Sequence, residues 1–170
     1  MKKLLIILSI FTFITTQAMD RFTLPADSHL NPVEQCFLLG ERLKLTDLEI
    51  LHLYLLTGAS ANDCDDSGKT PLMYAIMNKN IEVVQGLISA GADVNAQDNE
   101  GLTPLMYAVI YEKLYVLYAL IQAGANINLS SYDGRTPLAL ARYSVEKRIL
   151  STLINAQRNH EISRIAQRLF

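Results

Sequence analysis

A tripeptide that returns at a fixed interval constrains the fold of this chain more than any other feature of its sequence. Thr-Pro-Leu occurs at Thr70–Leu72, Thr103–Leu105 and Thr136–Leu138, and each copy begins 33 residues after the one before. The same interval separates the members of three other columns, which are Gly58, Gly91 and Gly124, then Gly68, Gly101 and Gly134, and then Asn62, Asn95 and Asn128. A fixed period of about 20–50 residues is typical of stacked repeats, each of which is one supersecondary unit.

Each repeat carries the signals of two short helices. The threonine of Thr-Pro-Leu can cap the first helix with its hydroxyl, and the proline follows where a missing N–H costs nothing. The glycine two residues before that threonine lies in a polar turn, where a residue that tolerates φ > 0 is favoured. Gly91 and Gly124 are expected to end the second helices as left-handed C-caps. Apolar residues follow helical spacing in both helices, from Leu72, Ala75 and Ile76 in a first helix to Val83, Val84, Leu87 and Ile88 in a second.

These apolar faces are too broad for one helix pair to bury alone, so neighbouring units must stack on each other. We therefore expect an all-α fold, a solenoid of about four stacked helix-turn-helix units with short hairpin turns that project from one edge. Burial of each aliphatic side chain stabilises the fold by roughly 1.5–3 kcal/mol, and these contributions together would supply most of the favourable free energy of folding.

The repeat motif resembles that of the ankyrin repeat family. Gly68–Leu72 together with Ala90–Asn95 is a specific match, and Gly101–Leu105 together with Ala123–Asn128 repeats it. The resemblance is strong over residues 46–156 and weak over 31–45. It implies an ankyrin solenoid, in which the first-helix columns and the hairpin tips line the concave face where partners dock.

The sequence departs from the family pattern at three columns. The family usually has histidine after Thr-Pro-Leu and glycine between the two helices. The residues at these two columns are Met73, Met106 and Ala139, and then Lys79, Glu112 and Val145. We expect the hydrogen bond that the histidine makes to be lost. Gln157 replaces the glycine that ends the other second helices, so the final helix is expected to run on through Ile162, Ile165 and Leu169.

The first 18 residues have the pattern of a secretory signal peptide. Lys2 and Lys3 form a basic start, residues 4–14 are uncharged and strongly apolar, and Thr16–Ala18 places small residues at the cleavage positions. An eleven-residue apolar run spans about 16 Å as a helix, well short of a hydrocarbon core of about 30 Å. We expect cleavage after Ala18, and the alternative is an uncleaved membrane anchor.

We divide the chain into four parts: a signal peptide at 1–18, a linker at 19–30, an ankyrin repeat domain at 31–157, and a C-terminal capping helix or tail at 158–170. The domain would comprise a capping repeat at 31–62 and repeats at 65–97, 98–130 and 131–157. Without residues 1–18 the chain has 17 acidic and 13 basic residues, a formal charge of −4. A mildly acidic chain argues against nucleic acid as a partner and against attraction to an anionic membrane.

No catalytic or metal-binding constellation is evident. The histidines, His29, His52 and His160, match no paired spacing of metal ligands. Asp63–Asp66 lacks the spaced ligands and terminal glutamate of a calcium loop, and Gly68–Thr70 lacks the upstream glycine of a phosphate-binding loop. Both fall on the polar turn of a repeat. We expect no metal, no cofactor and no small-molecule substrate.

Cys36 and Cys64 are the only two cysteines. In an exported protein they could form a disulfide that closes about 29 residues, worth roughly 3.5 kcal/mol in the chain-entropy model. Two independent thiols are the alternative, and the sequence leaves both open.

Tyrosines give the strongest indication of a binding surface. The chain has eight tyrosines and no tryptophan, and four of them lie between Tyr107 and Tyr118. Tyrosine is favoured in interfaces because it buries a large area and keeps a hydroxyl group. The family's concave face maps onto sixteen candidate partner-binding residues: Asp66, Ser67, Lys69, Tyr74, Met77, Asn78, Asn99, Glu100, Leu102, Tyr107, Ile110, Tyr111, Tyr132, Asp133, Arg135 and Tyr143. The alternative is that some tyrosines, in particular Tyr115 and Tyr118, fill gaps between repeats.

These features together favour a secreted or periplasmic ankyrin-repeat protein that acts as a non-catalytic interaction module for an unidentified protein partner. The alternative is an envelope-anchored scaffold that keeps its N-terminal segment as a membrane anchor. An enzyme is not expected, because few residues lie outside the repeats.

Overall fold

A computed structural model describes residues 55, 60–78 and 80–169, with side chains described as far as His160. All of the described residues belong to one unit of the chain, which begins at Pro32. The predicted signal peptide, the linker and nearly all of the capping repeat therefore lie outside the described residues.

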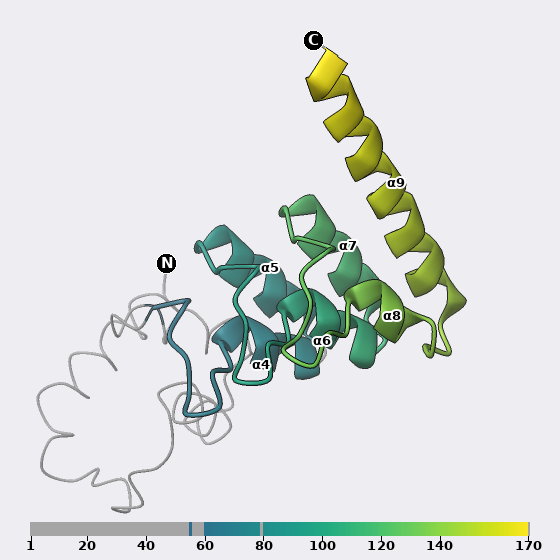
Figure 1. The fold of residues 1–170 in the computed structure, drawn as a ribbon. Coiled ribbons are helices and arrows are strands. Elements are labelled where there is room, and N and C mark those ends of the chain that lie inside the picture. The colour runs from purple at the N-terminus through teal and green to yellow at the C-terminus, as the bar shows by residue number, and fades with distance from the viewer. Residues whose placement is uncertain (1–54, 56–59, 79, 170) are drawn as a thin grey trace, which may run out of the picture. The chain divides into compact units, whose positions relative to one another are not determined.

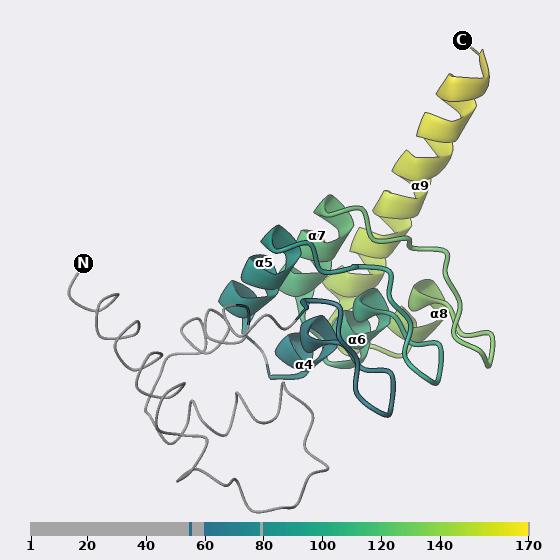
Figure 2. The same ribbon diagram turned by 90° about the vertical axis from the view of Figure 1, so that its left-hand side faces the viewer.

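Six helices follow one another in the described part of the chain, and no strand occurs there. They are α4 (Pro71–Met77), α5 (Ile81–Ser89), α6 (Pro104–Ile110), α7 (Leu114–Gln122), α8 (Pro137–Ala141) and α9 (Lys147–Leu169). Figures 1 and 2 show α4, α6 and α8 in one layer and α5, α7 and α9 in a second. Each helix contacts its partner within the repeat and the equivalent helix of a neighbouring repeat. The predicted all-α stack is confirmed.

The first helix of each repeat begins as the sequence predicts. Oγ1 of Thr70, Thr103 and Thr136 accepts the backbone N–H three residues later, at 3.4, 3.3 and 3.2 Å. In the first of these repeats the N–H of Thr70 also lies 3.5 Å from Sδ of Met73. This sulfur is a weak acceptor in place of the family's histidine, so the predicted loss of a hydrogen bond at this column is only partial here.

The second helices end at left-handed glycines. α5 and α7 are followed by Ala90 and Ala123, and Gly91 and Gly124 come next with φ of 87° and 88°. Each glycine donates its N–H to a carbonyl oxygen three residues earlier at 3.1 Å. The predicted C-caps are confirmed.

Asparagines at the 33-residue interval join one repeat to the next. Oδ1 of Asn62 accepts the N–H of Asp93 at 2.6 Å, and Oδ1 of Asn95 accepts the N–H of Asn126 at 2.7 Å. The side chain of Asn62 also donates to the carbonyl of Gly91 at 3.1 Å. The asparagine column is therefore a series of links between loops, each of which satisfies a backbone donor that no helix pairs.

The core lies between the two helix layers and between successive repeats. Its largest fully buried side chains are Leu72, Met73, Ile76, Leu87, Leu105, Met106, Leu117, Leu120, Ile149 and Leu153. Leu55 packs against this core from outside the described repeats. Every described repeat contributes to one continuous apolar cluster, as expected for a solenoid.

The last helix, α9, is much longer than α5 or α7. It has 23 residues, against nine in each of the other two second helices, and runs to Leu169 as predicted. Its first turns pack on α7 and α8, and its remainder projects beyond them (Figure 1). Among the described residues, no helix combines the length and the apolar character needed to cross a membrane.

Candidate protein-binding surface

Each of the first two described turns is fastened to the helix that follows it by an aspartate–tyrosine pair. The hydroxyl of Tyr74 donates to Oδ2 of Asp65 at 2.6 Å, and that of Tyr107 donates to Oδ2 of Asp98 at 2.7 Å. Oδ1 of Asp98 accepts the backbone N–H groups of Glu100 and Leu102, at 2.9 and 2.8 Å. These contacts fix the position of the turn tips relative to α4 and α6.

The turns are also joined to one another along one edge, where Figure 2 shows them side by side. The N–H of Asn99 donates to the carbonyl of Ser67 at 3.0 Å, and the N–H of Tyr132 donates to the carbonyl of Glu100 at 3.0 Å. These hydrogen bonds join the three turns into a single ordered strip, in which the middle turn is bonded to both of its neighbours.

Two of the predicted partner-binding residues are buried. Tyr107 is 5% exposed and Leu102 is 7% exposed, because both pack between neighbouring repeats. Burial and the hydrogen bond to Asp98 raise the pKa of the Tyr107 hydroxyl far above its ordinary value. Since little of either side chain is accessible to a partner, we leave both out of the binding surface.

Tyr107 nevertheless supports an exposed neighbour. Its ring stacks on that of Tyr111, with centroids 6.2 Å apart and an angle of 10° between the planes. Tyr111 is 36% exposed. Because the Asp98 contact fixes Tyr107, the ring of Tyr111 lies on a rigid base at the end of α6.

The other predicted residues are accessible to different degrees. Those that are half-buried are Ser67, Lys69, Tyr74 and Met77. Those that are exposed are Asp66, Asn78, Asn99, Glu100, Ile110, Tyr111, Tyr132, Asp133, Arg135 and Tyr143. Tyr132 at a turn tip and Tyr143 after α8 are the most exposed aromatics among the predicted residues, at 72% and 90%.

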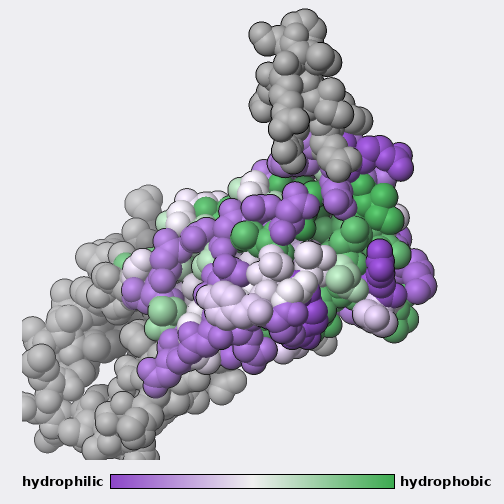
Figure 3. Space-filling model, in the orientation of Figure 1, coloured by the Kyte–Doolittle hydropathy of each residue, from purple (hydrophilic) through white to green (hydrophobic). Residues whose placement is uncertain are grey.

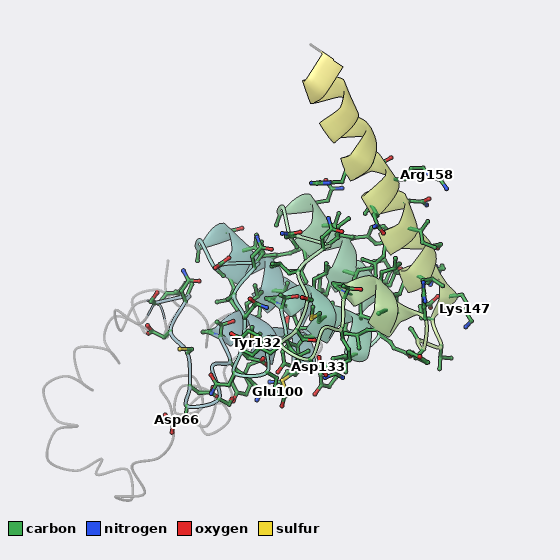
Figure 4. The ribbon with its side chains drawn as sticks, viewed as in Figure 1. Asp66, Glu100, Tyr132, Asp133, Lys147 and Arg158 are labelled. Atoms are coloured by element: carbon green, nitrogen blue, oxygen red, sulfur yellow. The ribbon has the colours of Figure 1, made fainter. Side chains whose placement is uncertain are left out.

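Charges at the tips are partly paired within each turn. Lys69 donates to the hydroxyl of Ser67 at 2.9 Å, and Arg135 forms an ion pair with Asp133. Hydrogen bonds from Ser131 and from Arg135 hold the pKa of Asp133 below its ordinary value. Figure 4 shows Asp66, Glu100 and Asp133 along the turn edge. Asp66 and Glu100 form no ion pair with a described residue, so the edge carries a mild negative charge.

The alternative role suggested for Tyr115 and Tyr118 is wrong for Tyr115, which is 76% exposed on the outward side of α7. Tyr118 is 46% exposed and reaches the next repeat. The hydroxyl of Tyr118 lies 3.1 Å from Oγ1 of Thr152 on α9. Both tyrosines line an open groove of about 710 Å³ that also touches Gln85 and Arg148. The helical spacing of the sequence indicates the exposure of Tyr115, because the buried residues of α7 lie on the other side of the helix.

The cysteine pairing cannot be followed in the described residues. Cys64 is exposed, and Cys36 lies outside them. The disulfide therefore stays a prediction. Among the residues that the structure describes, no three His, Cys, Asp or Glu side chains are grouped closely enough to hold a metal ion.

The repeat geometry agrees with the comparison to known families. A family model described as ankyrin repeats (3 copies) matches residues 43–131 and 91–165. These matches cover well over half of the chain, which therefore belongs to the ankyrin repeat family. Ankyrin repeats are generally protein–protein interaction modules and are typically non-catalytic. A comparison with curated proteins finds no match.

Proposed function

We propose that this chain is an exported, non-catalytic protein that binds another protein through its concave surface. This surface is defined by the exposed side chains at the turn tips and at the ends of α4, α6 and α8: Asp66, Asn78, Asn99, Glu100, Ile110, Tyr111, Tyr132 and Tyr143. The observation that carries the proposal is the exposure of Ile110, Tyr111, Tyr132 and Tyr143, which lies between 36% and 90%.

Large side chains of this kind favour association when a partner covers them. Burial of apolar area stabilises a complex by roughly 25 cal/mol per Å², and aromatic anchors often carry much of the binding energy. Tyr111 loses little freedom on binding because the ring of Tyr107 already holds it. The acidic tips beside these anchors would select a partner with complementary charge.

Export is the second part of the proposal, and it rests on the pattern of residues 1–18. The mass of the protein recovered from the exported fraction distinguishes a cleaved signal peptide from the alternative, an envelope-anchored scaffold. A mature protein that starts at Met19 would support cleavage. An exported protein that retains Met1–Ala18 would contradict it and favour the anchor.

The concave surface can be tested with two matched double variants. Tyr111→Ala with Tyr143→Ala removes two exposed anchors of the concave surface, and Tyr115→Ala with Tyr118→Ala removes two exposed tyrosines from the opposite layer. Chemical cross-linking in the native compartment with quantitative mass spectrometry would identify proteins captured by the wild type. We expect the first pair to lower this capture at least tenfold and the second to leave it unchanged, with the same helical circular dichroism for both. Equal capture by the two double variants would contradict the proposed surface.

A further inference from the structure

The third repeat exposes columns that are buried or partly buried in the two repeats before it. Val84 and Leu117 are both 0% exposed, but Leu150 at the same column is partly exposed. Ile88 and Ile121 are partly buried, whereas Ile154 is 41% exposed. The difference arises because the first two repeats are each covered by the next one, and no described residue covers the third.

These columns form a surface that we call the outer face of the third repeat. It is defined by Leu138 and Arg142 from the α8 segment and by Leu150 and Ile154 from α9. The equivalent face of the second repeat packs against α8 and α9. The outer face of the third repeat is therefore the kind of surface on which helices pack. Figure 3 shows hydrophobic surface gathered beside the base of α9.

One column of this face has changed from apolar to basic. Ile76 and Val109 are 0% and 2% exposed, and Arg142 stands in their place with its side chain exposed. The terminal repeat of a solenoid usually has a polar outer face. Here Arg142 is polar, but apolar leucines and Ile154 remain at least partly exposed beside it. The face is therefore an apolar surface that contains a cation.

More basic residues border the same face. Lys147, Leu150, Ile154 and Arg158 follow helical spacing along one side of α9. Figure 4 shows Lys147 and Arg158 extending from the side of α9 that faces away from α7. In the described part of the chain, neither of them nor Arg142 forms an ion pair. Glu146, the acid nearest in sequence to Arg142 and Lys147, is bound to Arg148 at 3.1 Å.

These basic residues belong to a basic C-terminal part of the chain, which the small net charge of the whole chain conceals. Residues 60–134 contain nine acidic and three basic residues, a formal charge of −6. Residues 135–170 contain two acidic and seven basic residues, a formal charge of +5. The mild acidity expected of the whole chain thus does not extend to its C-terminal part. Two copies that met through this basic face would repel each other, which argues against symmetric self-association.

We propose that the outer face of the third repeat binds an acidic amphipathic helix of a partner protein. The apolar side of that helix would cover Leu150 and Ile154 as a further repeat would. Its carboxylates would pair with Arg142, Lys147 and Arg158. This site is separate from the concave surface, so one chain could hold two partners at once.

Two synthetic helical peptides provide the probe for this proposal. Both carry leucine at positions i, i+3, i+4 and i+7, and the remaining positions are mainly glutamate in one and lysine in the other. Binding to the full chain is measured by titration calorimetry, and the contact residues by changes in backbone amide chemical shifts. We expect the acidic peptide to bind at least tenfold more tightly, with the shifts at Leu150 and Ile154, and to weaken as salt screens the charges.

Two charge-reversing double variants separate this site from general electrostatic attraction. Arg142→Glu with Arg158→Glu and Lys69→Glu with Lys113→Glu each change the formal charge by −4. The first should weaken binding of the acidic peptide at least tenfold, and the second should change it less than twofold. Equal losses in both variants, equal affinity for both peptides, or no binding of either would overturn the proposal.

Two other occupants have their own readouts. Sedimentation equilibrium of the chain alone would reveal a second copy on this face, as self-association that Arg142→Glu with Arg158→Glu abolishes. Co-sedimentation with vesicles of phosphatidylcholine and phosphatidylglycerol would reveal a membrane surface, as vesicle binding that the same pair abolishes. Either result in place of selective binding of the acidic peptide contradicts the proposed occupant.

Discussion

The carboxylate of Glu112 accepts the backbone N–H of Val145, 33 residues later, at 2.7 Å. The same oxygen, Oε1, accepts the hydroxyl of Ser144 at 3.1 Å. Glu112 lies in the turn between α6 and α7 with φ of 54°, a left-handed conformation that costs a residue with a Cβ about 1–2 kcal/mol. The family usually has glycine here. The glutamate keeps the strained conformation because its side chain links this turn to the turn of the next repeat.

Two substitutions of Glu112 should separate the cost of its left-handed backbone from the contribution of its two hydrogen bonds. Glu112→Ala keeps the left-handed strain and loses both hydrogen bonds, so we expect the free energy of unfolding to fall by about 1–3 kcal/mol. Glu112→Gly loses the same bonds but relieves the strain, and should be more stable than the alanine variant by about 1 kcal/mol. Urea unfolding followed by circular dichroism measures both. An alanine variant as stable as the wild type would show that the link contributes nothing.

Gly101 and Gly134 offer a matched test of the close contact between turns. Both have positive φ, at 77° and 83°. A Cβ on Gly101 would lie 2.6 Å from the backbone nitrogen of Tyr132, whereas a Cβ on Gly134 meets nothing within 4 Å. Gly134→Ala should therefore show backbone strain alone, and Gly101→Ala should cost at least about 1 kcal/mol more, because the turns must also separate. Equal melting temperatures for the two variants would rule out this contact.

The hydroxyl of Tyr107 should matter more for stability than those of the exposed tyrosines. Tyr107→Phe leaves Oδ2 of Asp98, a residue that is 3% exposed, without its hydrogen-bond donor. We expect a loss of about 1–3 kcal/mol in the free energy of unfolding. Tyr115→Phe removes a hydroxyl from a side chain that is 76% exposed and should change stability by less than about 0.5 kcal/mol. Denaturant unfolding of the two variants in parallel measures both changes. A Tyr107→Phe protein with wild-type stability would contradict a stabilising role for the hydrogen bond between Tyr107 and Asp98.

The sequence predicted local structure well and side-chain exposure poorly, for one physical reason. The caps at Thr70, Thr103 and Thr136 and the positive φ of Gly91 and Gly124 depend on a few neighbouring residues, so a motif identifies them. Exposure depends on what the next repeat covers. Tyr107 lies on α6 and Tyr111 caps its end four residues later, yet one is 5% exposed and the other 36%.

The same limit explains the two largest surprises at the surface. Tyr115 and Tyr118 share a crowded segment with Tyr107, yet Tyr115 is 76% exposed on the side of α7 that lies away from its buried residues. The sequence predicts that the apolar columns of the third repeat are buried, because the same columns belong to the core in the other repeats. Only the absence of a covering unit among the described residues makes Ile154 a surface residue.

Asp65 should make the fold sensitive to acid. Burial acts to raise the pKa of this carboxyl, but hydrogen bonds from the hydroxyls of Tyr74 and Ser67 and from the backbone of Lys69 and Ser67 together hold it below its ordinary value. A carboxyl whose pKa is lower in the folded than in the unfolded state stabilises the fold above the unfolded pKa, about 3.9 for aspartate, and this contribution is lost as the pH falls through the folded pKa. We therefore expect the melting temperature of the wild type to decline below about pH 4.

The substitution Asp65→Asn isolates this effect, because the amide keeps an acceptor for Tyr74 but cannot titrate. It should lower the melting temperature at pH 7, and the difference from the wild type should shrink as the pH falls below about 4, since protonation removes the advantage of the carboxylate. Asp66→Asn, which removes a neighbouring carboxylate at the exposed tip, serves as the control. Calorimetric melting at several pH values measures all three proteins. An Asp65→Asn variant that melts below the wild type by the same amount at every pH would mean that the carboxyl acts through packing, and that its charge contributes nothing to the fold.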